Sequence, residues 1–154
     1  MFDTQRIFHT GMVVADLAAA QRDIGASLGL DWTPVRRFGP MPFWTPEQGL
    51  HEIESQAVYS RQGPHHIEIL QGPKGSFYDP DRLPDGRHIG VWVDDLRAAA
   101  EDLIAQGWRA CAAGGAPEDG YGAFAYLAPA SGGLIVELVC HSLKPMIDAW
   151  LVER

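Results

Sequence analysis

The sequence has very few lysines, and those it has are far apart. Lys74 and Lys144 are the only two among 12 basic residues, which are outnumbered by 20 acidic ones, so the formal net charge is −8. Binding to nucleic acid or to an anionic membrane surface relies on clustered basic side chains. We therefore expect neither partner. Short basic segments such as Arg36–Arg37 suit only one anionic group on a small-molecule substrate.

Cysteines and long apolar segments are also scarce. Cys111 and Cys140 are the only cysteines and form no CxxC pattern, which favours two reduced thiols over a metal or redox motif. No apolar run approaches the roughly 18 residues of a membrane-spanning helix, and the first ten residues lack the apolar core of a secretion signal. With 154 residues and 46% hydrophobic content, the sequence predicts one folded domain located in the cytoplasm.

What the sequence does contain is one internal repeat. The segment HTGMVVADL, which starts at His9, resembles HIGVWVDDL, which starts at His88. Each copy opens with a short apolar, β-branched run that predicts a buried strand. Asp16 and Asp95 then stand where a helix N-cap would accept backbone N–H bonds, and apolar residues follow at helical spacing.

Three further strand candidates follow each predicted helix. In the first copy they are residues 32–38, 56–60 and 65–70, and in the second they are residues 108–112, 123–127 and 134–140. The sequence therefore predicts an α+β fold of two βαβββ modules. We expect a single domain over 1–154, with repeats at about 6–70 and 87–140, a linker at 71–86 and a short C-terminal helix at 143–152.

Two acidic residues interrupt apolar strands at equivalent places in the two modules. Glu68 lies within HHIEILQ and Glu137 within LIVELVC, and a carboxylate in such a strand is costly unless something neutralises it. His9 and His88 open the first strands, so pseudo-symmetry sets them opposite each other. Two imidazoles and two carboxylates suit one divalent ion of zinc, nickel, cobalt, manganese or iron.

These features resemble the vicinal oxygen chelate superfamily, which includes glyoxalase I, bleomycin resistance proteins, extradiol dioxygenases and methylmalonyl-CoA epimerase. The resemblance rests on the duplicated βαβββ pattern, the two HxG strand openings followed by Asp-Leu, and the IEIL and VEL strands. It implies that the two βαβββ modules form a curved eight-stranded mixed sheet around a central metal cavity. It also implies a metal held by His9, Glu68, His88 and Glu137, a small-molecule substrate and a homodimer. The 79-residue spacing of the histidines is most similar to methylmalonyl-CoA epimerase.

The chemistry that the resemblance implies is proton transfer beside a metal-bound carbonyl, as in an epimerase, isomerase or lyase. Glu137 or Glu68 would be the catalytic base, and we slightly favour Glu137. One alternative is an Fe²⁺ ring-cleaving dioxygenase that uses His9, His88 and Glu137 as a facial triad. Another is a metal-free binding or resistance protein.

Aromatic residues near these positions are candidates for the substrate pocket, although such residues more often belong to the core. The first module carries about ten additional residues, around GPMPFWTPEQGL (39–50), in which Phe43 and Trp44 could cover the pocket mouth. The pocket candidates are Trp44, His66, Trp92, Phe124 and Tyr126.

Overall fold

The computed structural model describes residues 3–82 and 87–154, so the part of the predicted linker at 83–86 lies outside the described residues. The strands are β1 (Ile7–Val13), β2 (Arg36–Thr45), β3 (Gly49–Tyr59), β4 (His66–Gln71), β5 (Arg87–Val93), β6 (Arg109–Ala113), β7 (Phe124–Ala128) and β8 (Ile135–Cys140). The helices are α1 (Leu17–Leu28), α2 (Leu96–Ala105) and α3 (Lys144–Val152).

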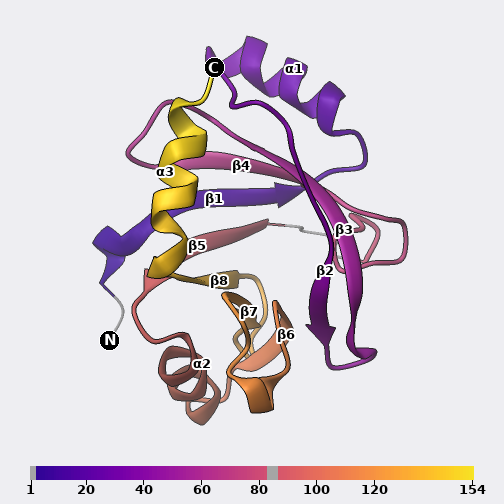
Figure 1. The fold of residues 1–154 in the computed structure, drawn as a ribbon, viewed down its shortest axis with the longest axis vertical. Coiled ribbons are helices and arrows are strands. Elements are labelled where there is room, and N and C mark those ends of the chain that lie inside the picture. The colour runs from indigo at the N-terminus through magenta and orange to yellow at the C-terminus, as the bar shows by residue number, and fades with distance from the viewer. Residues whose placement is uncertain (1–2, 83–86) are drawn as a thin grey trace.

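The eight strands form one mixed sheet that closes into a barrel in the order β1-β4-β3-β2-β6-β7-β8-β5 (Figure 1). Within each module the first and last strands are parallel, β1 with β4 and β5 with β8, while the other pairs are antiparallel. The two modules meet along the antiparallel pair of β1 and β5. The predicted α+β fold of two βαβββ modules is confirmed.

Both predicted helix N-caps are present. Asp16 accepts a hydrogen bond from the backbone N–H of Ala19 at 2.9 Å, and Asp95 accepts one from Ala98 at 3.0 Å. Gly29 ends α1 in the left-handed conformation, with φ of 66°. These caps satisfy backbone groups that have no partner within the helix, and they direct each helix back over the outer face of its module.

The additional segment in the first module is a strand hairpin rather than a covering loop. It extends β2 and β3 well beyond the predicted strands, and Pro40 falls in a bulge between Phe38 and Met41 where the ladder needs no N–H. The prolines therefore do not interrupt the strand. The single pair between Trp44 and Ala113 joins β2 to β6, so this hairpin closes the barrel.

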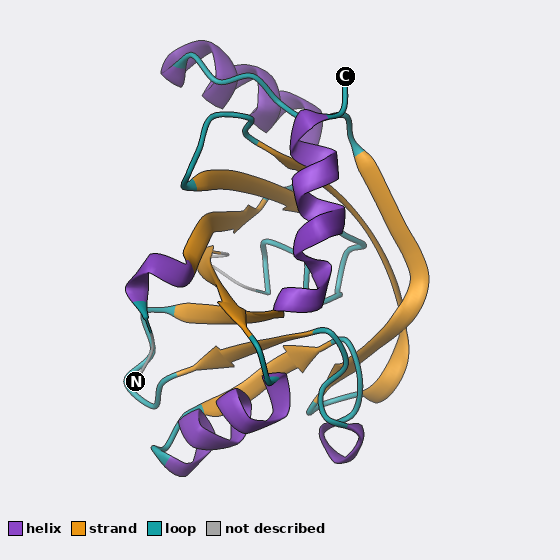
Figure 2. Cartoon of the chain, turned by 60° about the vertical axis from the view of Figure 1, so that its left-hand side comes forward, coloured by secondary structure: helices purple, strands orange, loops and turns teal. Residues whose placement is uncertain are grey.

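The inside of the barrel is filled by an aromatic-rich cluster drawn from both modules, including Tyr59 of β3 and Val139 of β8. Helix α3 lies across strands of both modules (Figures 1 and 2) and adds Ile147 and Trp150 to this cluster. The indole N–H of Trp150 donates to the Pro34 carbonyl at 2.8 Å, which fixes the helix to the first module. None of the helices among the described residues is long and apolar enough to cross a membrane.

Candidate metal centre

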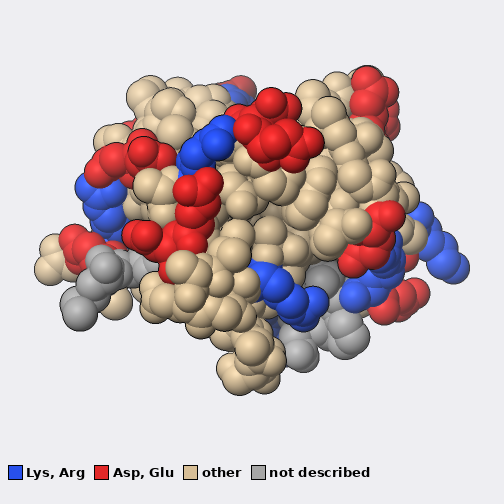
Figure 3. Space-filling view, turned by 90° about the horizontal axis from the view of Figure 1, so that it is seen from below, with Lys and Arg blue, Asp and Glu red and all other residues tan. Residues whose placement is uncertain are grey.

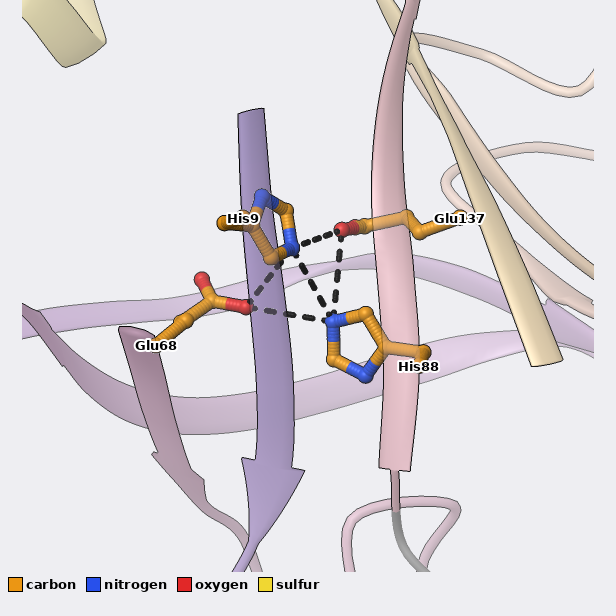
Figure 4. A group of neighbouring side chains, drawn as sticks. All are labelled: His9, Glu68, His88 and Glu137. Atoms are coloured by element: carbon orange, nitrogen blue, oxygen red, sulfur yellow. Dashed lines mark hydrogen bonds and ion pairs between the residues drawn. The ribbon is translucent and has the colours of Figure 1, made fainter. Parts of the chain in front are cut away.

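Four side chains from four adjacent strands point toward one another inside the barrel (Figure 4). They are His9 on β1, Glu68 on β4, His88 on β5 and Glu137 on β8, and all four are buried. The two imidazole Nε2 atoms are 3.1 Å apart. From His9 Nε2, the Oε2 atoms of Glu68 and Glu137 lie at 3.3 and 3.1 Å, and from His88 Nε2 they lie at 3.2 and 3.5 Å. The structure thus brings together every residue that the sequence predicted as a ligand.

The register of the strands explains why each histidine is followed by a glycine two residues later. In the β1–β5 ladder His9 pairs with Gly90 and Gly11 pairs with His88, so each imidazole lies over the glycine of the other module. A Cβ on Gly90 would come within 1.9 Å of His9 Cε1, and one on Gly11 within 2.0 Å of His88 Cε1. The HxG motif is therefore reciprocal, since each module supplies a ring and the space for its partner's ring.

The donor set fits a divalent metal ion. Glu68 and Glu137 are buried carboxylates, and among the described residues their only ion-pair partners are the two histidines. Ligands bound at roughly 2.1 Å from one ion are about 3.0 Å apart at octahedral angles and about 3.4 Å at tetrahedral angles. The separations of 3.1–3.5 Å between nitrogen and oxygen atoms match that range. Two nitrogen and two oxygen donors suit a transition metal better than calcium.

The charges in this cluster change its protonation. Burial alone lowers the pKa of His9, but the carboxylates of Glu68 and Glu137 outweigh it, and the pKa is raised. Burial would raise the pKa of Glu68, yet both imidazoles and the hydroxyl of Tyr59 favour the ionised carboxylate and lower the pKa. Without a metal, the protonated imidazole of His9 and the ionised carboxylate of Glu68 therefore stabilise each other.

Two tyrosines occupy equivalent positions beside the two carboxylates. Tyr59 pairs with Glu68 in the β3–β4 ladder, and Tyr126 pairs with Glu137 in the β7–β8 ladder. A third, Tyr78 from the linker, places its hydroxyl 3.0 Å from that of Tyr126. Burial and the carboxylate charges raise the pKa of all three well above 10.0, so each hydroxyl keeps its proton at neutral pH.

Tyr59 and Tyr78 are site residues that sequence reasoning missed. Tyr59 could have been found from the repeat, because Tyr59 and Glu68 correspond to Tyr126 and Glu137 with nearly the same spacing. Tyr78 carried no such signal, since it lies in a segment whose Gly, Pro and Asp content predicts only a linker. That segment in fact inserts Phe77 and Tyr78 into the aromatic cluster of the barrel.

Three of the five predicted pocket residues lie in or against the aromatic cluster inside the barrel. Trp92 and Tyr126 lie in the interior cluster, and Phe124 packs against it. Trp92 stacks on Phe8 with ring centroids 3.9 Å apart, because a bulge in β1 turns Phe8 to the same side as His9.

The other two candidates make contacts outside the interior aromatic cluster. Trp44 packs on the outer cluster beneath α2, on the opposite face of β2 from the fully buried Phe43. His66 Nδ1 donates a hydrogen bond to the Ser60 carbonyl at 2.8 Å, so its ring is held by the preceding turn.

An open cavity of about 680 Å³ reaches the cluster from one end of the barrel. Of the four cluster residues only His88 lines it, and Phe77 lies on the same wall. Phe77 also contacts Tyr126, with ring centroids 4.8 Å apart. The cavity is large enough for a small organic molecule. It meets the cluster on the side of the second module.

This combination of fold and buried centre agrees with comparisons to known proteins. The chain matches the Glyoxalase/Bleomycin resistance protein/Dioxygenase superfamily over residues 8–126, and it belongs to that superfamily. The structure is similar to that of methylmalonyl-CoA epimerase from Mycobacterium tuberculosis, with a TM-score of 0.58, 20% identity and coverage of 96% of this chain and 97% of that one.

It is also similar to a hypothetical protein from Bacillus halodurans, with a TM-score of 0.54, 16% identity and coverage of 87% and 92%. At these identities the solved structures establish the fold alone. No curated protein matches the sequence.

Proposed function

We propose that this protein is a metal-dependent enzyme that moves a proton at a carbon next to a carbonyl group, as an epimerase, isomerase or lyase does. The observation that carries the proposal is the buried cluster of two imidazoles and two carboxylates whose donor atoms all lie within 4.8 Å of one another. Membership of the superfamily and the similarity to an epimerase structure support it.

The proposed ligands are His9, Glu68, His88 and Glu137, which would hold one ion of zinc, nickel, cobalt, manganese or iron. A divalent ion there would supply Lewis-acid chemistry, withdrawing electron density from a carbonyl oxygen of the substrate. The chain's own residues would exclude water, accept the proton and donate hydrogen bonds. The rings of Tyr59 and Tyr126 pack against those of His9 and His88, which would limit the access of water to the centre.

We assign the base to Glu137 because it is held less tightly than Glu68. Glu68 Oε2 lies within 3.3 Å of both imidazoles, and its carboxylate also interacts with the Tyr59 hydroxyl. Glu137 Oε2 has one imidazole at 3.1 Å and the other at 3.5 Å. A carboxylate with fewer fixed partners is better able to swing toward a substrate C–H and take its proton.

The tyrosine pair on the Glu137 side suits the stabilisation of negative charge. Tyr126 and Tyr78 keep their protons because their pKa values are raised by burial and by the carboxylates. Their hydroxyls are therefore fixed donors in a water-poor interior, where a donor stabilises a developing oxyanion most strongly. We propose that one of them hydrogen-bonds the substrate oxygen on which charge develops.

Two measurements test the proposal. Protein purified without chelator is expected to contain about one equivalent of a transition metal, and Glu137→Gln should reduce metal-dependent hydrogen–deuterium exchange at the α-carbon of 2-keto acids or acyl thioesters by at least about 100-fold. Glu54→Gln, an exposed glutamate on β3, is the matched control and should keep the wild-type rate.

The outcome also separates the alternatives. Bound iron, together with oxygen consumption when aromatic diols are added, would favour the ring-cleaving dioxygenase over a proton-transfer enzyme. Failure to bind any of the five metals after reconstitution would leave a metal-free binding protein as the better account.

A further inference from the structure

The open cavity beside His88 carries a charge opposite to that of the chain as a whole. The chain has 20 acidic and 12 basic residues, and red carboxylates occur on both sides of the face in Figure 3. Among the described residues that line the cavity, however, three are arginines and one is acidic. They are Arg82, Arg87, Arg109 and Glu47. Three of the 12 basic residues thus line this cavity, against one of the 20 acidic residues.

These arginines come from three separate parts of the chain. Arg82 ends the described part of the linker, Arg87 begins β5 and Arg109 begins β6. Arg82 is held in place because its Nη1 donates to the Gly75 carbonyl at 2.7 Å, which leaves its other N–H groups available. Cationic side chains gathered at one cavity repel one another. An anion that enters the cavity would be attracted by all three of them and would offset this repulsion.

We infer that this cavity binds the anionic group, a carboxylate or a phosphate, of the small molecule on which the centre acts. The inference rests on the proposed function and names its substrate class. Guanidinium groups present paired N–H donors that match the oxygens of carboxylates and phosphates. His88 lines the same cavity, so a molecule anchored there would lie beside one of the four residues of the centre. At about 680 Å³ the cavity suits a small metabolite rather than a polymer.

The aromatic side chains between the cavity and the centre fit the same arrangement. Phe77 lines the cavity and lies 4.8 Å from Tyr126, whose ring is 5.2 Å from that of His88. An anionic group held among the arginines would place the uncharged part of the molecule against Phe77. The reacting carbon would then lie toward the tyrosine pair and Glu137.

Calorimetric titration with malonate, with pyrophosphate and with neutral malonamide tests the inference directly. We expect malonate or pyrophosphate to bind saturably, with a dissociation constant of about 1 mM or lower. The stronger of the two identifies the group as carboxylate or phosphate, and malonamide should not bind. The double variant Arg82→Met/Arg109→Met should bind about 100-fold more weakly, roughly tenfold for each lost charge-assisted contact. Arg87 is left intact because it adjoins His88.

Two controls accompany this titration, one charge-removing variant outside the cavity and the metal-free protein. Arg22→Met removes one exposed positive charge on α1, a helix that contributes no residue to the cavity lining, and should change binding less than about twofold. Chelator-treated protein should bind the anion as the metal-loaded protein does.

The inference is overturned if no anion binds saturably, if malonamide binds equally well, or if the double variant binds like wild type. Binding only in the metal-loaded form would mean that the metal holds the anion, which leaves the proposed function intact. Anion binding without metal-dependent proton exchange would support the inferred anion site and contradict the proposed function.

Discussion

Replacing Gly90 with alanine should abolish tight metal binding without removing any ligand. The added Cβ would lie 1.9 Å from His9 Cε1 and within 2.5 Å of both ring nitrogens, whereas ordinary contacts begin at 3.4 Å. The ring must therefore move by about 1.5 Å, the difference of the two distances. Metal–nitrogen bonds tolerate only about 0.2 Å. Gly11→Ala should displace the ring of His88 in the same way.

We expect each glycine variant to lose at least about 100-fold in zinc affinity, which corresponds to about 2.8 kcal/mol. Competition titration with a chromogenic chelator measures this loss, and circular dichroism in chelator verifies that the barrel persists. Thr10→Ala is the control, because Thr10 lies between His9 and Gly11 on β1 and its hydroxyl contacts His65. Zinc affinity within about threefold of wild type in both alanine variants would refute the reciprocal arrangement.

Three further predictions concern protonation and the tyrosine pair. Tyr78→Phe or Tyr126→Phe leaves the other buried hydroxyl without its partner and should lower the free energy of unfolding by about 1–3 kcal/mol, and the double variant should lose clearly less than the sum in denaturant titrations. In the metal-free protein, the raised pKa of His9 adds stability that is complete below pH 6.5 and fades at higher pH. The lowered pKa of Glu68 adds stability that is complete above pH 4.5 and fades at lower pH. Melting temperatures in chelator should therefore be higher between these values than at about pH 8, and a steady rise toward pH 8 would contradict the assignment. Burial raises the pKa of Cys111, so its alkylation by iodoacetamide should be slower than that of a free thiol at about pH 8 and should keep accelerating above pH 9.0, as mass spectrometry of the modified peptide would detect.

The repeat made the fold and the four proposed ligands accessible from sequence. His9 and His88 share a strand position, as do Glu68 and Glu137, and duplication converts two ambiguous residues into a symmetric set of four. The helix caps at Asp16 and Asp95 could also be predicted from the sequence, because each depends on a contact between residues only three positions apart.

Features that depend on contacts between distant segments could not be predicted in this way. The hairpin after Phe38 contains prolines, and only the bulge that accommodates Pro40 makes the strand continuous. The side to which Trp44 points follows from the same register. The bulge at Phe8 likewise reverses the face that simple alternation assigns.

The surroundings of Glu68 and Glu137 differ between the two modules, and this difference bears on the proposed chemistry. The two carboxylates are equivalent in the repeat, yet the linker places the Tyr78 hydroxyl 3.0 Å from that of Tyr126, the tyrosine that pairs with Glu137. The open cavity also meets the centre at His88 rather than at His9, with Phe77 of the same linker on its wall. A substrate that enters there meets fixed hydroxyl donors and the less tightly held carboxylate together. Under the proposed function, the segment between the modules would therefore determine which carboxylate of the symmetric set acts as the base. Exchange of roles between Glu68 and Glu137 is expected only when both Phe77 and Tyr78 are replaced by alanine.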